Sequence, residues 1–208
     1  MSSGAGAALD STGKRAAFAL FYGPLHFLAV AHAVRQLGAD TPAPASILDI
    51  GCGTGAGGAA WALAGGTASI TGIDRHPWAV EEARRTYRDL GLRGHARVGD
   101  LARASVSGYK GVVAAYVLNE LPDQPRRRIE DHLSGAAQRG TRVLIVEPIA
   151  RRITPWWDDT AVRLGTVAPR ARTDEWRVPI ELPPMLRMFD RAAGLDHREI
   201  TFRTMYLG

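Results

Sequence analysis

The segment 47–55 has a composition that could hold a nucleotide-like ligand. Its apolar run contains Asp49 and leads into a loop with glycine at every second position, Gly51, Gly53 and Gly55, and small apolar residues follow. Glycine allows a positive φ and a close approach of the backbone to a ligand. The free amides and the dipole of a helix N-terminus favour a carboxylate or phosphate. The segment predicts a strand, a tight turn and a helix, although the same pattern also occurs in turns that bind nothing.

Two further acidic residues follow apolar stretches and extend this pattern. The stretch 69–74 reads as a second strand ending in Asp74, about twenty residues beyond the turn, where an acid in a dinucleotide-binding fold accepts hydrogen bonds from a ribose. A third stretch, 95–99, precedes Asp100. Acids at three strand ends suit a ligand with an amine, a ribose diol and an adenine amine, and S-adenosylmethionine has all three. Asp74 could also cap the next helix, and Asp49 could simply brace the turn.

Four motifs resemble, in order, those of class I S-adenosylmethionine-dependent methyltransferases. They are 47–55, Gly72-Ile73-Asp74, Gly99-Asp100-Leu101 and 116–121, within a resemblance that covers roughly residues 45 to 150. A dinucleotide-type loop would read GxGxxG, whereas this loop follows directly on an Asp-Ile pair, which favours S-adenosylmethionine over NAD. The resemblance implies a Rossmann-like α/β fold and a transferase whose product is S-adenosylhomocysteine.

The resemblance also implies which residues contact the cofactor. Asp49 is expected to lie beneath the turn and bond its amides or the cofactor ammonium. Asp74 is expected to accept both ribose hydroxyls, and the Arg75 guanidinium to stack on the adenine. The other expected contacts come from the turn and from the ends of the third and fourth strands: Gly51, Gly53, Gly55, Asp100, Leu101, Ala115 and Tyr116.

The N-terminal region offers three more candidate residues. Residues 12–37 read as a helix that Gly23-Pro24 should kink or split. Tyr22 and His26 are four residues apart and share a helix face, so they could close over the active site, with Arg15 on the cofactor carboxylate. The alternative is an amphipathic helix that covers the sheet and partly buries His26.

Methyl transfer is an in-line displacement at a sulfonium methyl group, which requires alignment more than acid–base chemistry. A base helps only where the acceptor has a proton to lose. Asn119 and Glu120 after the fourth strand and Glu147 after the fifth are the candidates to orient or deprotonate an acceptor. Their alternative roles are helix capping for Glu120 and hydrogen bonding at the sheet edge for Glu147.

Several absences bear on the acceptor. The Asn-Pro-Pro-aromatic turn of amino-methylating nucleic-acid enzymes is replaced by Asn119-Glu120-Leu121-Pro122, and the sole cysteine, Cys52, lies in the glycine loop. No histidine or carboxylate cluster has convincing metal-ligand spacing, so no metal is expected. The Trp-rich segment 149–182 could wall off a small organic acceptor, which we slightly favour.

Two other functions remain open at this stage. Arg15–Phe18, Tyr116–Pro122 and Val146–Pro148 resemble a methyltransferase-like subfamily associated with ribosomal small-subunit assembly, but the extra cysteines common there are missing. A ribosomal RNA methyltransferase or ribosome-assembly factor is therefore the second hypothesis. A cofactor-binding module without turnover is the third.

The elements that must position these residues alternate along the chain. The alternation predicts an α/β fold with a mostly parallel sheet and helices on both faces. The expected strands are 46–50, 68–73, 95–99, 111–118 and 141–147, with helices at 56–64, 77–90 and 124–138. After residue 148 the clear features are a helix at 183–193 and a strand at 197–207. With only a possible strand at 176–182, that edge of the sheet is expected to be shortened or rearranged.

The domain organisation follows from these elements and from the length of 208 residues. We expect a disordered stretch 1–10 and a single domain 11–208. Its parts are an N-terminal helical cap, a cofactor-binding core, a Trp-rich insertion or lid, and a terminal helix and strand, at 11–40, 45–148, 149–182 and 183–208.

Composition limits the environment and the partners. The net charge is +5 and the pI about 9.9, yet only Lys14 and Lys110 are lysines, so arginine bias explains the charge as well as an RNA partner does. One cysteine allows no internal disulfide. No run of about 18 apolar residues and no signal pattern occurs, so we expect no membrane contact and a cytoplasmic protein. The oligomeric state is left open.

Overall fold

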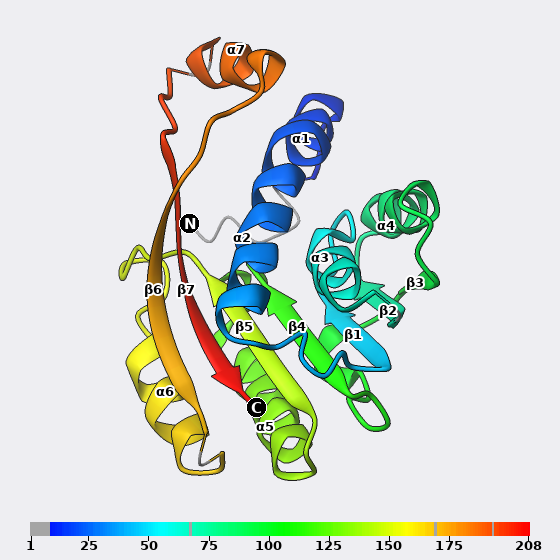
Figure 1. The fold of residues 1–208 in the computed structure, drawn as a ribbon, viewed down its shortest axis with the longest axis vertical. Coiled ribbons are helices and arrows are strands. Elements are labelled where there is room, and N and C mark those ends of the chain that lie inside the picture. The colour runs from blue at the N-terminus through cyan, green and yellow to red at the C-terminus, as the bar shows by residue number, and fades with distance from the viewer. Residues whose placement is uncertain (1–8, 67, 169, 193) are drawn as a thin grey trace.

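The computed structural model describes residues 9–208 except 67, 169 and 193, so the expected disordered stretch 1–10 lies almost entirely outside the described residues. One seven-stranded sheet forms the centre of the molecule, in the order β3-β2-β1-β4-β5-β7-β6 (Figure 1). All neighbouring strands are parallel except β7, which is antiparallel to both β5 and β6. This architecture confirms the predicted Rossmann-like α/β fold.

The strand and helix bounds match the expected alternation to within about three residues, the usual uncertainty of element ends. The strands are β1 Ser46–Ile50, β2 Ser69–Asp74, β3 Gly94–Val98, β4 Gly111–Ala115, β5 Arg142–Glu147, β6 Arg172–Pro179 and β7 Glu199–Leu207. The helices after β1 are α3 Ala56–Gly65, α4 Pro77–Asp89, α5 Asp123–Gln138, α6 Trp157–Gly165 and α7 Pro184–Ala192, with 3-10 turns η3 Leu101–Arg103 and η4 Leu118–Glu120.

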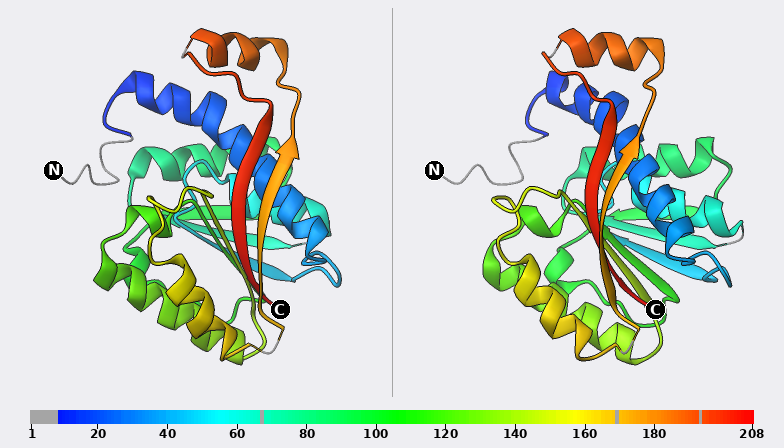
Figure 2. Two further views of the ribbon diagram at one scale, coloured as in Figure 1. Left: turned by 90° about the vertical axis from the view of Figure 1, so that its left-hand side faces the viewer. Right: turned by 60° about the vertical axis from the view of Figure 1, so that its left-hand side comes forward.

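Helices cover both faces of the sheet and enclose two hydrophobic cores (Figure 2). Successive residues of a strand point to opposite faces, so Ile47 enters the core beneath the N-terminal helix, α3 and α4, whereas Leu48 enters the core beneath α5 and α6. Trp61 and Tyr87 are the largest fully buried side chains of the first core. The parallel strands are buried on both faces, which places their carboxyl ends, and the loops that follow, at one edge.

The N-terminal helix is continuous and is not split at Gly23-Pro24. It consists of α1 Thr12–Ala17, a π-helical turn η2 Phe18–Tyr22 and α2 Gly23–Gln36. Proline has no N–H to donate, and the helix accommodates Pro24 with one wider turn. In this turn the Gly23 amide donates to the Phe18 carbonyl, five residues earlier. The expected split does not occur, and a π turn precedes the proline.

The same helix corrects the expectation about membrane spans. By length and composition alone, Thr12–Gln36 is long and apolar enough to cross a membrane. In the structure its buried side chains, among them Ala29, Val30 and Val34, belong to the core that faces the sheet, and α2 packs on α3 and β7. A helix that covers a sheet has the same apolar character.

The C-terminal part completes the sheet instead of shortening it. The predicted strand at 197–207 is confirmed as β7, and β6 pairs with it antiparallel from Arg172↔Tyr206 to Pro179↔Glu199. β6 begins at Arg172, four residues before the expected 176–182. The sequence pattern missed its first residues because exposed and half-buried residues alternate along this edge strand, which gives a weak hydrophobic signal. Figure 1 shows α7 at the far end of the extended β6 and β7.

The three tryptophans of the Trp-rich segment pack against the fold. Trp156 and Trp157 are buried in the core beneath α6, where guanidinium groups stack on them: Arg126 Cζ lies 4.9 Å from the ring centroid of Trp156, and Arg203 Cζ 4.5 Å from that of Trp157. Trp176 donates its indole N–H to Thr204 Oγ1 at 3.0 Å within the sheet. Aromatic rings gain free energy when they leave water, so these residues pack against the cores.

Candidate active site

The turn between β1 and α3 needs glycine because of its backbone conformation and its neighbours. Gly51, Gly53 and Gly55 have φ values of +66°, +52° and +82°. A Cβ on Gly51 would lie 2.2 Å from Val117 Cγ2. The amides of Gly51 and Cys52 both donate to the Ile73 carbonyl, at 2.8 and 3.1 Å, which ties the turn to the end of β2. The predicted tight turn is therefore present.

Asp49 braces the helix that follows the turn. Its Oδ2 accepts a hydrogen bond from the Gly58 amide at 2.7 Å, so it bonds the first turn of α3 and not the loop amides that we expected. The residue is only 1% exposed, and this burial raises the pKa of its carboxyl group to about 7. Asp49 also lines the pocket described below, within reach of a bound ligand.

Asp74 links the glycine turn to the start of α4. Its Oδ2 accepts from the Gly53 amide at 2.9 Å and its Oδ1 from the His76 amide at 2.8 Å. The N-cap of α4 is His76, whose Nδ1 accepts from the Trp78 amide at 3.2 Å, so Asp74 is not the helix cap. Each carboxylate oxygen has two lone pairs, so both oxygens can accept one more hydrogen bond.

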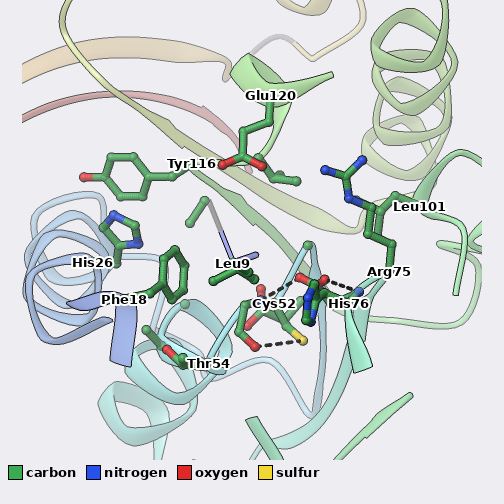
Figure 3. A pocket seen from close by; sticks show the side chains of 18 of the residues that line it. Leu9, Phe18, His26, Cys52, Thr54, Arg75, His76, Leu101, Tyr116 and Glu120 are labelled. Atoms are coloured by element: carbon green, nitrogen blue, oxygen red, sulfur yellow. Dashed lines mark hydrogen bonds between the residues drawn. The ribbon is translucent and has the colours of Figure 1, made fainter. Parts of the chain in front are cut away.

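A small pocket of about 70 Å³ lies over the ends of β1, β2 and β4. Figure 3 shows side chains from these strand ends and from the N-terminal helix converging on it. It brings together most of the predicted site residues, namely His26, Asp49, Gly51, Gly53, Asp74, Arg75, Leu101, Ala115, Tyr116 and Glu120. Several further lining residues were not predicted: Leu9, Phe18, Cys52, Thr54, Ala56, Gly57, His76, Val117 and Leu121.

A second cavity of about 490 Å³ adjoins this pocket, and both are lined by Arg75, Leu101 and Leu121. Asp100 lies in this second cavity. Its Oδ1 accepts from the Ala102 amide at 3.0 Å, and its side chain is 59% exposed. The two cavities together follow the ends of β1, β2 and β3. Their arrangement matches the expected path of a ligand from the glycine turn past Asp74 to Asp100.

Five predicted residues line neither of the two cavities. Arg15 Nε donates to the Leu9 carbonyl at 2.8 Å, and its Cζ lies 5.9 Å from the Trp78 ring centroid, so its guanidinium holds the chain and not a ligand carboxylate. Gly55 instead faces Tyr87 and Ala83 of α4. The other three, Tyr22, Asn119 and Glu147, are described in turn below.

Only one residue of the expected Tyr22–His26 pair reaches the pocket. Tyr22 is 46% exposed and lines a separate apolar cavity. His26 stacks on Tyr116 with ring centroids 3.9 Å apart, and burial lowers its pKa to about 4. The His26 ring is therefore neutral at pH 7. Regular helical spacing does not identify Phe18, because a π-helical turn at Phe18–Tyr22 interrupts that spacing.

Tyr116 adopts a strained backbone conformation that no sequence pattern predicted. Its φ of +56° makes it the sole non-glycine residue with a positive φ among residues 9–208 as described. A bulky residue is rarely found there, and such strain clusters at functional sites. The Tyr116 amide donates to the Val146 carbonyl at 2.7 Å, which helps to hold the conformation.

Glu147 supports the turn after β4. It is fully buried, and its Oε1 accepts from the amides of Leu118 and Asn119 at 2.8 and 3.3 Å. Asn119 is drawn towards Glu147, away from the pocket lining. Neither residue lines the pocket, since parallel-sheet packing encloses the end of β5, and the expected contact of either with an acceptor stays a prediction.

Glu120 is the one predicted acid–base candidate that lines the pocket. The residue is exposed at the pocket mouth, and partial desolvation raises the pKa of its carboxyl group above the ordinary value, while Arg75 opposes that shift. A glutamate whose pKa lies nearer neutrality is suited to general-base chemistry. Within the described part of the chain, no three His, Cys, Asp or Glu side chains are grouped so that they could hold a metal ion.

The buried carboxyl group of Glu147 predicts a pH dependence of stability. Burial raises its pKa to about 8, so the folded state binds the proton more tightly than the unfolded chain does. Its stabilising contribution is complete at low pH and is lost as pH rises through about 8. We expect Glu147 alone to lower the free energy of unfolding by roughly 1 kcal/mol per pH unit between about pH 5 and 7.5.

Glu147→Gln is the variant that isolates this group, because it keeps the Oε1 acceptor and cannot ionise. Chemical denaturation of both proteins across this pH range measures the effect. The variant should be less sensitive to pH than the wild type, and both should have similar stability at about pH 5. Parallel curves for the two proteins would show that Glu147 does not titrate as inferred. Asp49 contributes with the same sign and leaves a residual slope in the variant.

The fold and the glycine turn define the class of this protein, and comparisons with known proteins agree. Residues 47–140 match the family model described as "Methyltransferase domain". The match spans the chain from the glycine turn to the end of α5. A solved structure, magnesium protoporphyrin IX methyltransferase from Synechocystis PCC 6803 with bound SAH, has the same fold, with a TM-score of 0.59 and 17% identity over 88% of this chain and 82% of that chain.

Two curated relatives act on chemically different acceptors according to their names. A 2-ketoarginine methyltransferase from Streptomyces arginensis is 34% identical over 123 residues, 57% of this chain and 36% of the relative. A ribosomal RNA small subunit methyltransferase C from Actinobacillus pleuropneumoniae serotype 5b (strain L20) is 26% identical over 132 residues, 64% of this chain and 40% of the relative. The matches thus span less than half the length of either relative.

Proposed function

We propose that this chain transfers the methyl group of S-adenosylmethionine to a small organic acceptor. The observation that carries the proposal is the alignment of three features at adjacent strand ends: the glycine turn after β1, Asp74 at the end of β2 and Asp100 after β3. The match of residues 47–140 to a methyltransferase domain supports the same reaction. When bound, the cofactor supplies an electrophilic methyl group on a sulfonium.

The residues present fit the cofactor part by part. Asp74 has free acceptor capacity for ribose hydroxyls, and Asp49 offers a buried carboxylate to an ammonium group. The second cavity, with Asp100 and Leu101, has room for an adenine. The pocket itself would need to widen, since about 70 Å³ is below the several hundred Å³ of ordinary ligand pockets.

A small acceptor is favoured over RNA by the surroundings of the pocket. Leu9, Phe18 and His26 narrow the pocket with apolar and neutral groups. In the run 126–128, Arg126 is buried against Trp156, and none of these arginines lines the pocket. RNA remains the second candidate, because the chain has a net charge of +5 and one relative is named as a ribosomal RNA enzyme.

Two measurements test the function. Isothermal titration calorimetry with S-adenosylhomocysteine should detect binding to the purified chain. Radiolabelled S-adenosylmethionine incubated with separated cell fractions should place label in the small-molecule fraction. Label in ribosomal RNA would support the second candidate. Binding without transfer to any fraction would support a cofactor-binding module.

Glu120→Gln tests the proposed base directly. The variant keeps the size of the side chain and removes its ability to accept a proton, so kcat should fall by roughly 10²–10³-fold if the acceptor must lose a proton. The dissociation constant for S-adenosylhomocysteine should change less than about threefold, since Glu120 lies outside the expected cofactor contacts. An unchanged kcat would exclude Glu120 as the base.

A further inference from the structure

The pocket lining between the N-terminal helix and the loop after β4 combines apolar rings with the carboxylate of Glu120. Phe18, His26 and Tyr116 contribute rings, Leu9 an aliphatic group and Glu120 the acid. In Figure 3 the Glu120 carboxylate lies across the pocket from Phe18 and Leu9, with Tyr116 and His26 to one side. We call Phe18, His26 and Tyr116 the aromatic wall. A carboxylate facing such a wall is a chemical environment that selects cations.

The Glu120 carboxylate is available to a ligand, because its charge is not engaged by other side chains of the described protein. No hydrogen bond or ion pair of its side chain is found within the described part of the protein. Asp74 and Asp49, by contrast, each accept a backbone amide hydrogen bond. Arg75 is the nearby cation that acts on the Glu120 carboxyl group, but the two side chains form no ion pair. The pocket mouth therefore holds a carboxylate without a fixed counter-charge.

The aromatic wall carries no positive charge that would repel a cation. His26 is neutral at pH 7 because burial lowers its pKa to about 4. Its ring packs on Tyr116 at 3.9 Å and meets the Phe18 ring edge-on, with centroids 6.0 Å apart. Aromatic rings attract ammonium groups through their quadrupoles, and they do so more strongly where water is excluded.

The wall is also held in one arrangement. Tyr116 keeps its positive φ through the hydrogen bond to the Val146 carbonyl and the stack on His26. The Phe18 ring packs closely on the glycine turn, and this contact constrains it. A Cβ added to Gly53 would lie only 3.2 Å from the ring. A prearranged wall lowers the entropic cost of binding a small ligand.

We propose that the methyl acceptor is a small amine, bound as its ammonium form between Glu120 and the aromatic wall. The inference rests on the proposed methyl transfer. Glu120 first accepts a proton from the ammonium group, which leaves a neutral amine. The nitrogen lone pair then forms the new bond to the methyl carbon while the methyl–sulfur bond breaks, and that electron pair stays on sulfur. The products are an N-methylammonium and S-adenosylhomocysteine. A carboxylate acceptor would instead meet the like charge of Glu120.

The first test compares acceptors of matched size. Labelled S-adenosylmethionine is incubated with sets of small primary amines and the alcohols and carboxylic acids of the same carbon skeletons, and label transfer is measured. We expect transfer to amines, with kcat/KM at least tenfold above that for any alcohol or acid. Preferential transfer to alcohols or acids, or no transfer to any amine, would overturn the proposal.

The second test measures the ammonium subsite without any reaction. Choline and its neutral carbon isostere, dimethylbutanol, are titrated into the chain saturated with S-adenosylhomocysteine. Choline should bind at least tenfold more tightly than the isostere, and Glu120→Gln should remove most of that preference. Phe18→Leu, which keeps apolar volume without a π face, should weaken choline binding by about fivefold. Equal binding of the two compounds by the wild type would overturn the proposal.

Controls separate this inference from the proposed function. Glu175→Gln is the matched control, since Glu175 is exposed on the edge strand β6 and does not line the pocket, and it should leave choline binding unchanged. S-adenosylhomocysteine binding to all variants shows that they are folded and loaded. Failure to bind S-adenosylhomocysteine would refute the proposed function itself. Its binding together with transfer to a different acceptor class refutes only the amine assignment.

Discussion

Gly51→Ala is expected to lower the free energy of unfolding by roughly 2–5 kcal/mol and to abolish cofactor binding. Two costs add up at this position. A side chain at the φ of +66° costs about 1–2 kcal/mol, and forcing a methyl group into packed surroundings costs about 1–3 kcal/mol more. The added Cβ would meet Val117 Cγ2 at 2.2 Å, at the start of the loop that carries Tyr116 and Glu120.

Chemical denaturation measures the stability, and calorimetry with S-adenosylhomocysteine measures the binding. Gly165→Ala is a suitable control, because Gly165 lies at the end of α6, has no atom within 4 Å of the added Cβ and has no positive φ. That change should leave stability unchanged or raise it by up to about 1 kcal/mol, since alanine favours helix. A Gly51→Ala protein as stable as the wild type would show that the turn tolerates a side chain.

Asp74→Ala is expected to weaken S-adenosylhomocysteine binding by roughly 1.5–3 kcal/mol, about 10- to 150-fold. The variant loses the expected hydrogen bonds from the ribose. It also frees the Gly53 amide, held at 2.9 Å, and the His76 amide, held at 2.8 Å, so the glycine turn loses its tie to α4. Both effects act on the same ligand site.

Asp100→Ala provides the comparison for Asp74. Asp100 is 59% exposed and pairs with Arg103 at 3.4 Å, so its loss should weaken binding less, by about 1 kcal/mol or below. Calorimetry on both variants, with denaturation curves to confirm folding, gives the two values. Equal losses, or an unaffected Asp74→Ala protein, would contradict the placement of the ribose at Asp74.

Local sequence patterns were sufficient for the strand–turn–helix unit and for the alternation of parallel strands with helices. The alternating glycines require positive φ values, and an apolar run buried on both faces can hardly be anything but a central strand. Because parallel strands end at one edge, Asp49 and Asp74 were bound to lie near each other once the alternation was recognised. These inferences depend only on neighbours in the chain and on the topology that alternation implies.

Other features depended on contacts between distant segments. The burial of Glu147 follows from the turn after β4, whose Leu118 amide bonds its carboxyl group from 29 residues away along the chain. The tryptophans of the segment 149–182 were compatible with a lid or a core, and packing decided it: Trp156 and Trp157 lie in the core beneath α6, and Trp176 packs against the other core. Apolar and charged side chains have many potential partners, so the sequence alone does not choose among them.

The sequence by itself determined the class of fold, the glycine turn and the acidic residues at the strand ends, because these follow from local conformation and from strand order. Only the tertiary structure decided which acid reaches the pocket, which is Glu120 and not Glu147, and which rings face it. That choice is made by burial and by long-range hydrogen bonds, whose energies depend on the whole packed chain.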